Sequence, residues 1–319
     1  VHSPGTYISY DEGNSEKITN NIACIWIDVH KPMLQNRSLL NNVSKTRENI
    51  ICGVAIANIF TGTSYITEFQ QPLSIQPSTF DELERVITTH SPSEIVFISP
   101  FDQEKINSIL HYAGIQSRAV HCVNSSTSEK VEHCTQQKFI SHLLGKFYGE
   151  DALNNCVEFS VYPTATQSFC FLLDFVQEHN PNLVKNIAIP IFHNNNEMLL
   201  ANHTLKQLNI LDDHSLDSTQ HGHLSSVNSF LNKCCTPMGR RRFFTQLVNP
   251  TTDQTWLQKE YTMIAELLNE TMYPYVSTTR KTLVQIRDIE KMCRQIVMRK
   301  IYPCSLYYLE MSMQHILSI

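Results

Sequence analysis

Patterns typical of β-strands are confined to about the first 200 of the 319 residues, and the remainder contains only helical patterns. Short β-branched runs and period-two alternation predict strands, whereas apolar residues spaced three and four apart predict helices. A chain of this length can hold two domains of ordinary size. We therefore expect a mixed α/β domain followed by an all-α domain.

The first part of the chain predicts a meander of three strands, followed by a helix, a strand, a helix and a strand. Thr61 and Gly62 make a tight turn inside the meander. Ser78 or Thr79 is expected to cap the first helix, and Gly114 ends the second. The predicted strands are residues 22–29, 50–57, 63–69, 94–99 and 119–123, and the predicted helices are residues 78–90 and 102–113.

This order of elements is that of a ribonuclease H-like fold. A polar insertion or long loop at residues 31–48 interrupts the meander. Helices at residues 136–148 and 163–179 follow, and then a strand at residues 186–192 with a hairpin-like return through residues 194–200.

The last hundred residues predict a helical bundle. Thr236 supplies an N-cap hydroxyl and Pro237 a favourable first helical residue, so a helix is expected at residues 237–248. One further helix is expected at residues 224–231, before it. After it come a helix capped by Thr252 or Asp253, an apolar stripe from Leu283 to Ile296 and a last helix from Pro303. Four large side chains near the end fit a helix core better than a base-stacking platform: Tyr307, Tyr308, Met311 and Met313.

Charge divides the chain at the same place, although the overall formal charge is only −5. Residues 222–319 hold 12 Lys and Arg against 7 Asp and Glu, and residues 1–221 hold 13 against 23. A change from net −10 to net +5 commonly accompanies a domain boundary. We place a linker in the polar stretch where the sign changes, at residues 212–222.

The ten cysteines contain no Cys-x-x-Cys pair, and several lie inside apolar runs. They behave as small core residues, which predicts a reducing, intracellular compartment. No run of eighteen apolar residues occurs, so we expect no membrane-spanning helix.

Three consecutive arginines, Arg240, Arg241 and Arg242, follow the predicted cap at Thr236. They could contact nucleic-acid phosphates or an acidic partner, or form interdomain contacts. The net positive charge of this part suits a domain held near DNA. They could also form salt bridges within the helical domain while their stems pack on apolar neighbours. We favour the second interpretation, because three successive side chains around one helix cannot all face one groove.

A metal-dependent nuclease of the ribonuclease H-like type is the main alternative. It would need an acidic side chain at the end of the fourth strand, but Ser99 and Pro100 stand there instead. We do not favour it, because a fold does not carry a function. Its candidate metal ligands are Asp28, Glu82, Glu84 and Asp102.

A loose group of His and Cys residues around the linker offers a second possible metal site. Zinc sites need tighter ligand pairs, and adjacent cysteines rarely bind one metal together. A polar linker with incidental histidines is the favoured interpretation. The residues concerned are His214, His221, His223, Cys234 and Cys235.

Four short segments carry a resemblance to a known family. Residues 228–253 contain Thr-Pro-Met-Gly-Arg-Arg, then a helix and a Pro-containing turn that ends in Asp; residues 288–291 read Asp-Ile-Glu-Lys. Residues 3–6 read Ser-Pro-Gly-Thr, and residues 53–63 form strand, turn and strand. They resemble the start of the core domain, a core-helix segment, the end of the mismatch-recognition domain and the connector strands of MutS DNA mismatch-repair proteins. The family order, over nearly the whole chain, makes the resemblance specific.

The resemblance implies a division of the chain into parts of a longer protein. The first, residues 1–17, would be the tail of the mismatch-recognition domain and a linker, and residues 18–211 a ribonuclease H-like connector domain. After the linker at residues 212–222, residues 223–319 would be the N-terminal part of the helical core, or lever, domain. Because the sequence opens on Val and stops inside a helical pattern, we expect an internal fragment.

The complete protein is expected to bind mismatched double-stranded DNA as a homodimer and to couple recognition to ATP and Mg. No Gly-x-x-x-x-Gly-Lys-Ser/Thr loop occurs in the sequence, and no Phe-x-Glu occurs in a mismatch-reading context. We therefore expect no catalytic, cofactor-binding or metal-binding residue here, and a segment that transmits between the recognition domain and the clamp and ATPase.

The insertion at residues 31–48 and the content of 24 Asn against 9 Gly are closer to coral mitochondrial and giant-virus MutS-like proteins than to bacterial ones. A mitochondrial location is therefore expected. The non-enzymatic alternative is a helical scaffold fused to an inactive ribonuclease H-like domain that serves only protein–protein contacts.

Overall fold

The computed structural model describes residues 21–30, 48–115, 119–149, 152, 156–179, 181–184, 187–192, 198, 204–211 and 226–319. The landmark at residues 3–6, residues 31–47 of the predicted insertion at 31–48, most of the hairpin-like return and the linker at residues 212–222 lie outside them. The chain divides into two compact units, Val1–His193 and Asn194–Ile319, and each is described by itself.

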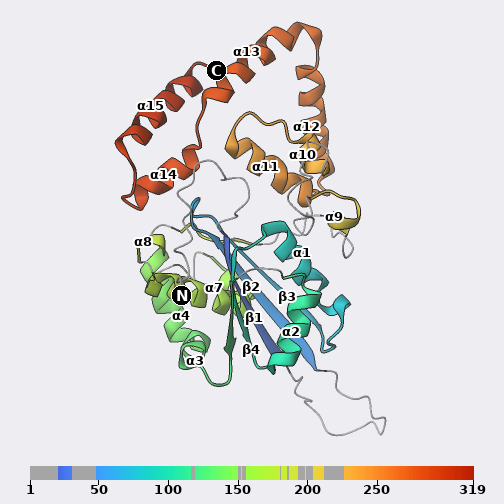
Figure 1. Cartoon of the computed structure of the whole chain (residues 1–319), viewed down its shortest axis with the longest axis vertical. Coiled ribbons are helices and arrows are strands. Elements are labelled where there is room, and N and C mark those ends of the chain that lie inside the picture. The colour runs from blue at the N-terminus through green and yellow to red at the C-terminus, as the bar shows by residue number, and fades with distance from the viewer. Residues whose placement is uncertain are drawn as a thin grey trace. The chain divides into compact units, whose positions relative to one another are not determined.

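The first unit is built around a six-stranded sheet with the order β5-β4-β1-β2-β3-β6 (Figure 1). β1 pairs antiparallel with β2, and β2 pairs antiparallel with β3, which forms the predicted meander. β4 lies parallel to β1 and β5 parallel to β4, while β6 is added in parallel to β3. The strands are β1 (Asn21–His30), β2 (Asn49–Asn58), β3 (Ser64–Pro72), β4 (Glu94–Ser99), β5 (Ala119–Asn124) and β6 (Ile191–Phe192).

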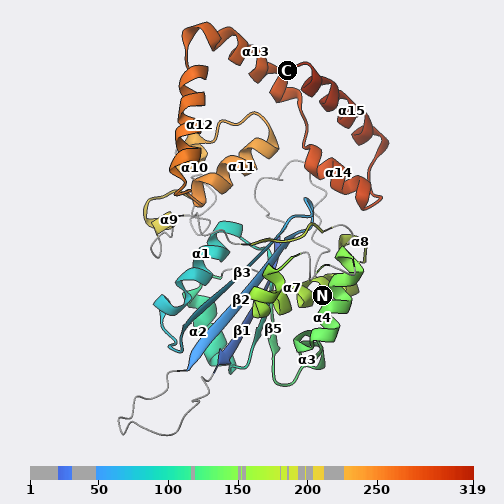
Figure 2. The same ribbon diagram turned by 180° about the vertical axis from the view of Figure 1, so that it is seen from behind.

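Helices cover both faces of this sheet (Figures 1 and 2). Ile25 and Ile27 of β1 share one buried core with Leu83 of α1 and Ile109 of α2. The intervening Trp26 faces the opposite side, because successive side chains of a strand alternate between faces. The helices of this unit are η1 (Pro77–Phe80), α1 (Asp81–His90), α2 (Gln103–Tyr112), α3 (Glu129–Thr135), α4 (Gln137–Tyr148), α6 (Glu158–Val161), α7 (Pro163–His179) and α8 (Pro181–Val184).

Helix α7 packs directly on the middle of the sheet. A Cβ placed on Gly53 of β2 would lie 2.4 Å from the carbonyl carbon of Thr164 and 2.5 Å from the amide nitrogen of Ala165. The Glu68 carboxylate of β3 accepts the Ala165 N–H at 2.9 Å, which satisfies a free amide at the helix N-terminus. Further along, the Ser168 hydroxyl donates to the backbone carbonyl of Cys24 at 2.7 Å. The absent side chain at Gly53 therefore sets how closely α7 approaches the sheet.

The second unit is helical throughout its described residues, apart from an isolated bridge at Thr251. Few of its apolar side chains are buried; Val248, Ile286, Met292 and Met298 are among them. Nowhere in the described chain is there a helix long and apolar enough to cross a membrane. The helices are α9 (Thr204–Gln207), α10 (Val227–Leu231), α11 (Pro237–Val248), α12 (Gln254–Leu267), η2 (Glu270–Met272), α13 (Tyr273–Gln285), α14 (Ile289–Val297) and α15 (Pro303–Leu317).

The predicted order of an α/β part and then a helical part is confirmed, but two predictions for the first unit were wrong in detail. Neither Ser78 nor Thr79 caps α1, because both lie in the 3-10 turn that precedes it. Within the described residues 187–192, the predicted strand is reduced to Ile191–Phe192, which pairs with β3.

Two predictions for the helical unit were also wrong. The stripe from Leu283 to Ile296 is not one helix: the backbone is extended at Ile286, and α14 starts after Asp288. The side chains near the end do not form a helix core. Tyr307, Tyr308 and Met313 are 59%, 45% and 45% exposed.

Replacing Gly53 by Ala is expected to destabilise the first unit by about 2–3 kcal/mol, because the added methyl meets backbone atoms of α7 that cannot move independently. Urea unfolding can be followed by fluorine NMR of fluorotryptophan-labelled protein, since Trp26 reports the first unit and Trp256 the second. Gly149→Ala is the control: its Cβ meets nothing within 4 Å, and only its φ of +96° is strained. Its expected cost is about 1 kcal/mol. Equal losses in the two variants would contradict the packing explanation.

His90 at the end of α1 is expected to make the first unit sensitive to acid. Its ring lies 4.7 Å from that of Tyr65, and burial, with a smaller contribution from Arg85, lowers the pKa of His90 to about 4. The unfolded chain therefore takes up a proton near pH 6.5 that the folded unit takes up only near pH 4. The contribution of neutral His90 to the unfolding free energy is fully present above pH 6.5. As the pH falls to about 4, the unfolding free energy decreases by up to about 3 kcal/mol.

The His90→Phe variant keeps a ring against Tyr65 but cannot titrate. The difference in unfolding free energy between wild type and variant, measured from pH 7 to pH 4.5, should follow this curve. A difference that does not change with pH would refute the role of His90.

Candidate functional site

Two successive helices of the helical unit, α10 and α11, begin with side-chain caps. Ser226 and Ser229 form a capping box at the start of α10. The predicted cap of α11 is confirmed: the Thr236 hydroxyl accepts the N–H of Gly239 at 3.0 Å, and Pro237 is the first helical residue. A Cβ on Gly239 would lie 2.9 Å from the Thr236 hydroxyl oxygen, so glycine permits this close cap.

The three consecutive arginines of α11 point in different directions, as successive residues of a helix must. The Arg240 Nε donates to the backbone carbonyl of Cys234 at 3.2 Å. Arg242 is exposed and forms no ion pair with any residue that the structure describes. Arg241 turns toward two acidic side chains, one of α14 and one of the residue before it.

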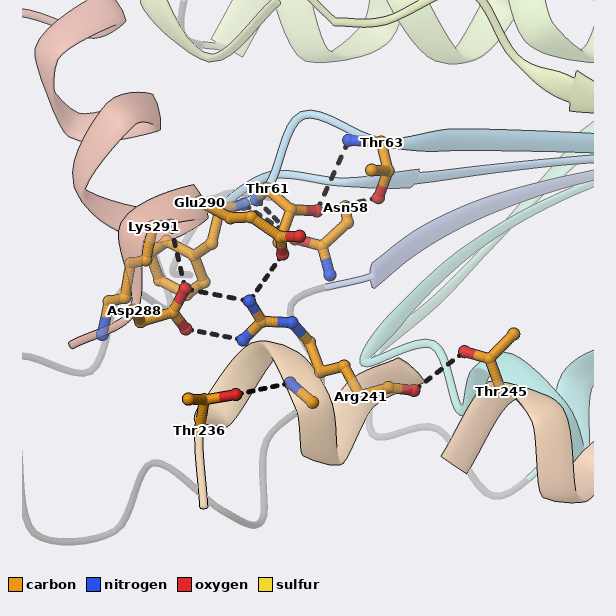
Figure 3. A network of polar contacts seen from close by, with 11 residues as sticks. Asn58, Thr61, Thr63, Thr236, Arg241, Thr245, Asp288, Glu290 and Lys291 are labelled. Carbon is orange, nitrogen blue, oxygen red and sulfur yellow. Dashed lines mark hydrogen bonds and ion pairs between the residues drawn. The ribbon is translucent and has the colours of Figure 1, made fainter. Parts of the chain in front are cut away.

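Arg241 joins α11 to the start of α14 (Figure 3). Its Nη1 lies 2.6 Å from one carboxylate oxygen of Asp288, and its Nη2 lies 2.9 Å from the other. The same Nη2 lies 2.6 Å from the Glu290 carboxylate. This two-pronged geometry fixes the guanidinium plane as well as its position. We call Arg241, Asp288 and Glu290 the Arg241 network.

Besides pairing with Arg241, Asp288 is the N-cap of α14. Its Oδ1 accepts the N–H of Lys291 at 3.1 Å. Burial opposes its ionisation, but the hydrogen bonds from Arg241 and Lys291 and their charges hold the pKa of Asp288 below its ordinary value. The hydrogen bond to Asp288 and the charges of both carboxylates raise the pKa of Arg241 above its usual range. One carboxylate therefore both starts α14 and ties it to α11.

The candidate ligands of the nuclease alternative are not brought together. Asp28 and Asp102 are exposed, and Asp102 lies 3.8 Å from Lys105. Glu82 pairs with Arg85 at 3.0 Å, whereas Glu84 is buried. Within the described parts of the chain, no group of three or more His, Cys, Asp or Glu side chains could hold a metal ion. Nothing there favours metal-dependent cleavage.

The possible metal site of His and Cys residues around the predicted linker is described only in part. His214, His221 and His223 lie outside the described residues. Cys234 and Cys235 are partly buried free thiols ahead of α11.

The sequence did not indicate that Asp288 and Glu290 are the partners of Arg241. The sequence offered one signal for Asp288: an Asp ahead of an apolar stripe is a possible helix N-cap, here for the N–H of Lys291 three residues on. The pairing itself joins residues 47 positions apart, which no local pattern reveals. The ion pairs of Arg241 are those expected if it acts within the helical domain. Nucleic-acid or interdomain contacts of Arg240, Arg241 and Arg242 stay a prediction.

Comparison with known proteins matches residues 203–319 to the family model of MutS domain III. A mutS homolog of Acanthamoeba polyphaga mimivirus is 26% identical over 95% of this chain and 28% of its own length. The DNA mismatch repair protein MutS of Caldanaerobacter subterraneus is 22% identical over 99% of the chain and 31% of its own length. The mitochondrial DNA mismatch repair protein mutS homolog of Sarcophyton glaucum is 28% identical over 39% of the chain and 12% of its own length.

A sheet-containing unit followed by a helical unit that matches a MutS domain defines the class of protein. Residues 203–319 belong to the MutS domain III family, and MutS relatives are similar to 95% and 99% of the chain. It spans 28% and 31% of the length of the mimivirus and Caldanaerobacter relatives. Contacts divide the chain between His193 and Asn194, whereas the predicted linker at residues 212–222 stays a prediction.

A double-mutant cycle should measure the Arg241 network. Arg241→Met and Asp288→Asn are combined; Asn still accepts the Lys291 N–H and so keeps the cap. We expect a coupling energy of about 1–2 kcal/mol between the two positions, from urea unfolding followed at Trp256. Because the folded-state pKa of Asp288 is lowered, the coupling is complete above the ordinary Asp pKa and is lost as the pH falls through the folded-state value.

Arg242→Met is the matched control on the same helix and should change the unfolding free energy by less than about 0.5 kcal/mol. Additive effects of Arg241→Met and Asp288→Asn at neutral pH would show that the network contributes nothing.

Proposed function

We propose that the chain is an internal segment of an ATP-dependent DNA mismatch-repair protein that binds mismatched DNA. Its role there is to transmit between a recognition domain and the clamp and ATPase. The match of residues 203–319 to MutS domain III carries this proposal. The relatives described as DNA mismatch repair proteins support it. Because the chain spans about a third or less of their length, the activity belongs to the complete protein.

The first unit is proposed to be a ribonuclease H-like connector domain. Its antiparallel β1–β2–β3 meander, with β4 and β5 added in parallel beside β1, supports this assignment. The assignment concerns the fold alone, since a fold does not imply cleavage. The connector would carry the recognition domain on one side and lead into domain III on the other.

The Arg241 network supports a role in transmission. It holds the first long helix of domain III, α11, to α14 by a two-pronged ion pair and a shared cap. Two helices joined in this way move as one body more readily than helices that share only exposed surfaces. A displacement of α11 would therefore move α14 with it.

ATP, Mg and mismatched double-stranded DNA are proposed ligands of the complete protein, which would act as a homodimer. No described cluster of side chains forms a metal site, so no chemical step is assigned to this segment. A mitochondrial location is proposed from composition, and the match to the coral mitochondrial relative supports it.

The test of this function uses the complete gene product. It should bind a mismatched duplex more tightly than a matched one and hydrolyse ATP faster with the mismatch bound. Residues 1–319 alone should do neither. Arg241→Met should lower the mismatch-stimulated ATP turnover at least about fivefold, because coupling between distant sites is commonly worth 1–3 kcal/mol.

Basal turnover and mismatch affinity without ATP should stay within about twofold in Arg241→Met, and Arg242→Met should behave as wild type. A complete product that does not discriminate mismatches would refute the function. Unchanged stimulation in Arg241→Met would refute only the transmission by this network.

A further inference from the structure

Two adjacent thiols lie in the loop between α10 and α11. Cys234 and Cys235 are both free, and both are partly exposed, so that dissolved reagents reach them. No other two of the ten cysteines are neighbours in the sequence. Adjacent thiols differ from a single one because both sulfurs can react in turn with one reagent. We call Cys234 and Cys235 the Cys234–Cys235 pair.

The Cys234 side chain lies against the first turn of α11. A Cβ built on Gly239 would lie 3.4 Å from the Cβ of Cys234 and 3.8 Å from its Sγ, so the glycine leaves space for the thiol. In the same turn, the Met238 N–H has no acceptor among the described residues. Proteins commonly place reactive cysteines at such positive helix ends, where free amides are available.

The backbone on both sides of the pair is held by hydrogen bonds. The carbonyl of Lys233 accepts from Arg280 at 3.2 Å, and that of Cys234 accepts from the Arg240 Nε at 3.2 Å. Thr236, directly after the pair, caps α11 through the N–H of Gly239. Consecutive Cα atoms are about 3.8 Å apart, whereas disulfides usually join Cα atoms about 4.4–6.8 Å apart. A bond between the two sulfurs therefore requires the backbone next to the cap to move.

The other cysteines are less suited to this reaction. Burial raises the pKa of Cys24 and of Cys134 to about 12, which keeps both as unreactive thiols. Cys122, Cys293 and Cys304 are exposed, but each lacks an adjacent cysteine in the sequence. Such a thiol forms a mixed disulfide with a small reagent and has no neighbour in the sequence to displace it.

We propose that the Cys234–Cys235 pair is a reversible modification site, which a small disulfide such as glutathione disulfide oxidises and whose oxidation loosens the cap of α11. One protein thiol loses its proton, attacks the reagent and expels one glutathione thiolate. The second thiol loses its proton, attacks the protein sulfur of the mixed disulfide and expels the other glutathione. Two protein thiols and one glutathione disulfide thus become one protein disulfide and two glutathione molecules.

The strain in this disulfide makes the modification easy to reverse. Disulfides that distort their surroundings are reduced more readily than relaxed ones, so an excess of reduced glutathione should restore both thiols. The site requires no activity of the complete protein, and it does not rest on the proposed function.

The experiment treats purified residues 1–319 with glutathione in which the disulfide form is increased stepwise. Remaining thiols are blocked with N-ethylmaleimide, and the protein is digested with trypsin. Cleavage after Lys233 and Arg240 releases both cysteines of the pair in one peptide that contains no other cysteine. Mass spectrometry should show this peptide with two hydrogens fewer and no maleimide, and dithiothreitol should reverse the change. A peptide that carries only maleimide or glutathione would overturn the proposal.

Two variants separate the pair from the other exposed thiols. Cys235→Ser cannot close the ring, so a glutathione adduct should persist on Cys234. The matched control is Cys293→Ser/Cys304→Ser, which removes two exposed thiols that are not adjacent. Its Cys234–Cys235 disulfide should form as in wild type. Loss of the disulfide in this control would overturn the proposal, because the pair would then depend on thiols elsewhere.

The effect on the cap is measured by amide hydrogen exchange at Gly239, whose N–H the Thr236 hydroxyl accepts. Oxidation of the pair should speed this exchange about fivefold, the size of effect expected when an N-cap is lost. Reduction should restore the original rate. An unchanged rate at Gly239 in fully oxidised protein would overturn the link to the cap, and with it the proposal.

Discussion

The ion pair between Arg241 and Asp288 is the interaction on which the helical unit most depends. Few apolar side chains are buried there, and the end of α12 and the start of α13 are exposed, Leu268 by 79% and Tyr273 by 72%. With little core to fix the helices, their relative positions rest on directional contacts, and a two-pronged ion pair that also caps a helix supplies both distance and orientation. Burying this carboxylate is tolerable because Arg241 and an amide compensate it.

The sheet unit is organised in the opposite way. β1 and β4 are buried on both faces, and α1 and α2 close one side while α7 closes the other. Polar contacts there position elements that are already packed: Glu68 fixes the N-terminus of α7, and Gly53 lets that helix reach the backbone of β2. A densely packed unit followed by a sparsely packed one suits the proposed role in transmission, because the second unit can respond where the first cannot.

The order of elements could be predicted from the sequence because nearly every strand and long helix has the spacing of apolar residues that is typical of its type. The caps at Thr236 and Asp253 were also predictable, since both lie directly ahead of an apolar pattern. The break at Ile286 could not be predicted, because Leu283 and Ile289 keep helical spacing across it. The contacts beside the break join residues far apart in the sequence: Arg241 with Asp288, and the Arg287 N–H with the Ser312 hydroxyl. Exposure of Tyr307 was misjudged for a related reason: spacing shows which residues share a face, not whether anything covers it.

The candidate site shows the same limit. The sequence identified three arginines at the right place, but the structure separates them into one that is neutralised, one held on a loop carbonyl and one that points to solvent. Arg280 could not be associated with Lys233 from the sequence, because the contact joins residues 47 positions apart.

Native-state hydrogen exchange, resolved by residue, tests the central claim most directly. If the Arg241 network joins α11 to α14, the amides of both helices should exchange through one opening, with equal free energies and the same dependence on low urea. Should α14 exchange with a distinctly lower opening free energy while α11 stays protected, the two helices are not joined and the account fails.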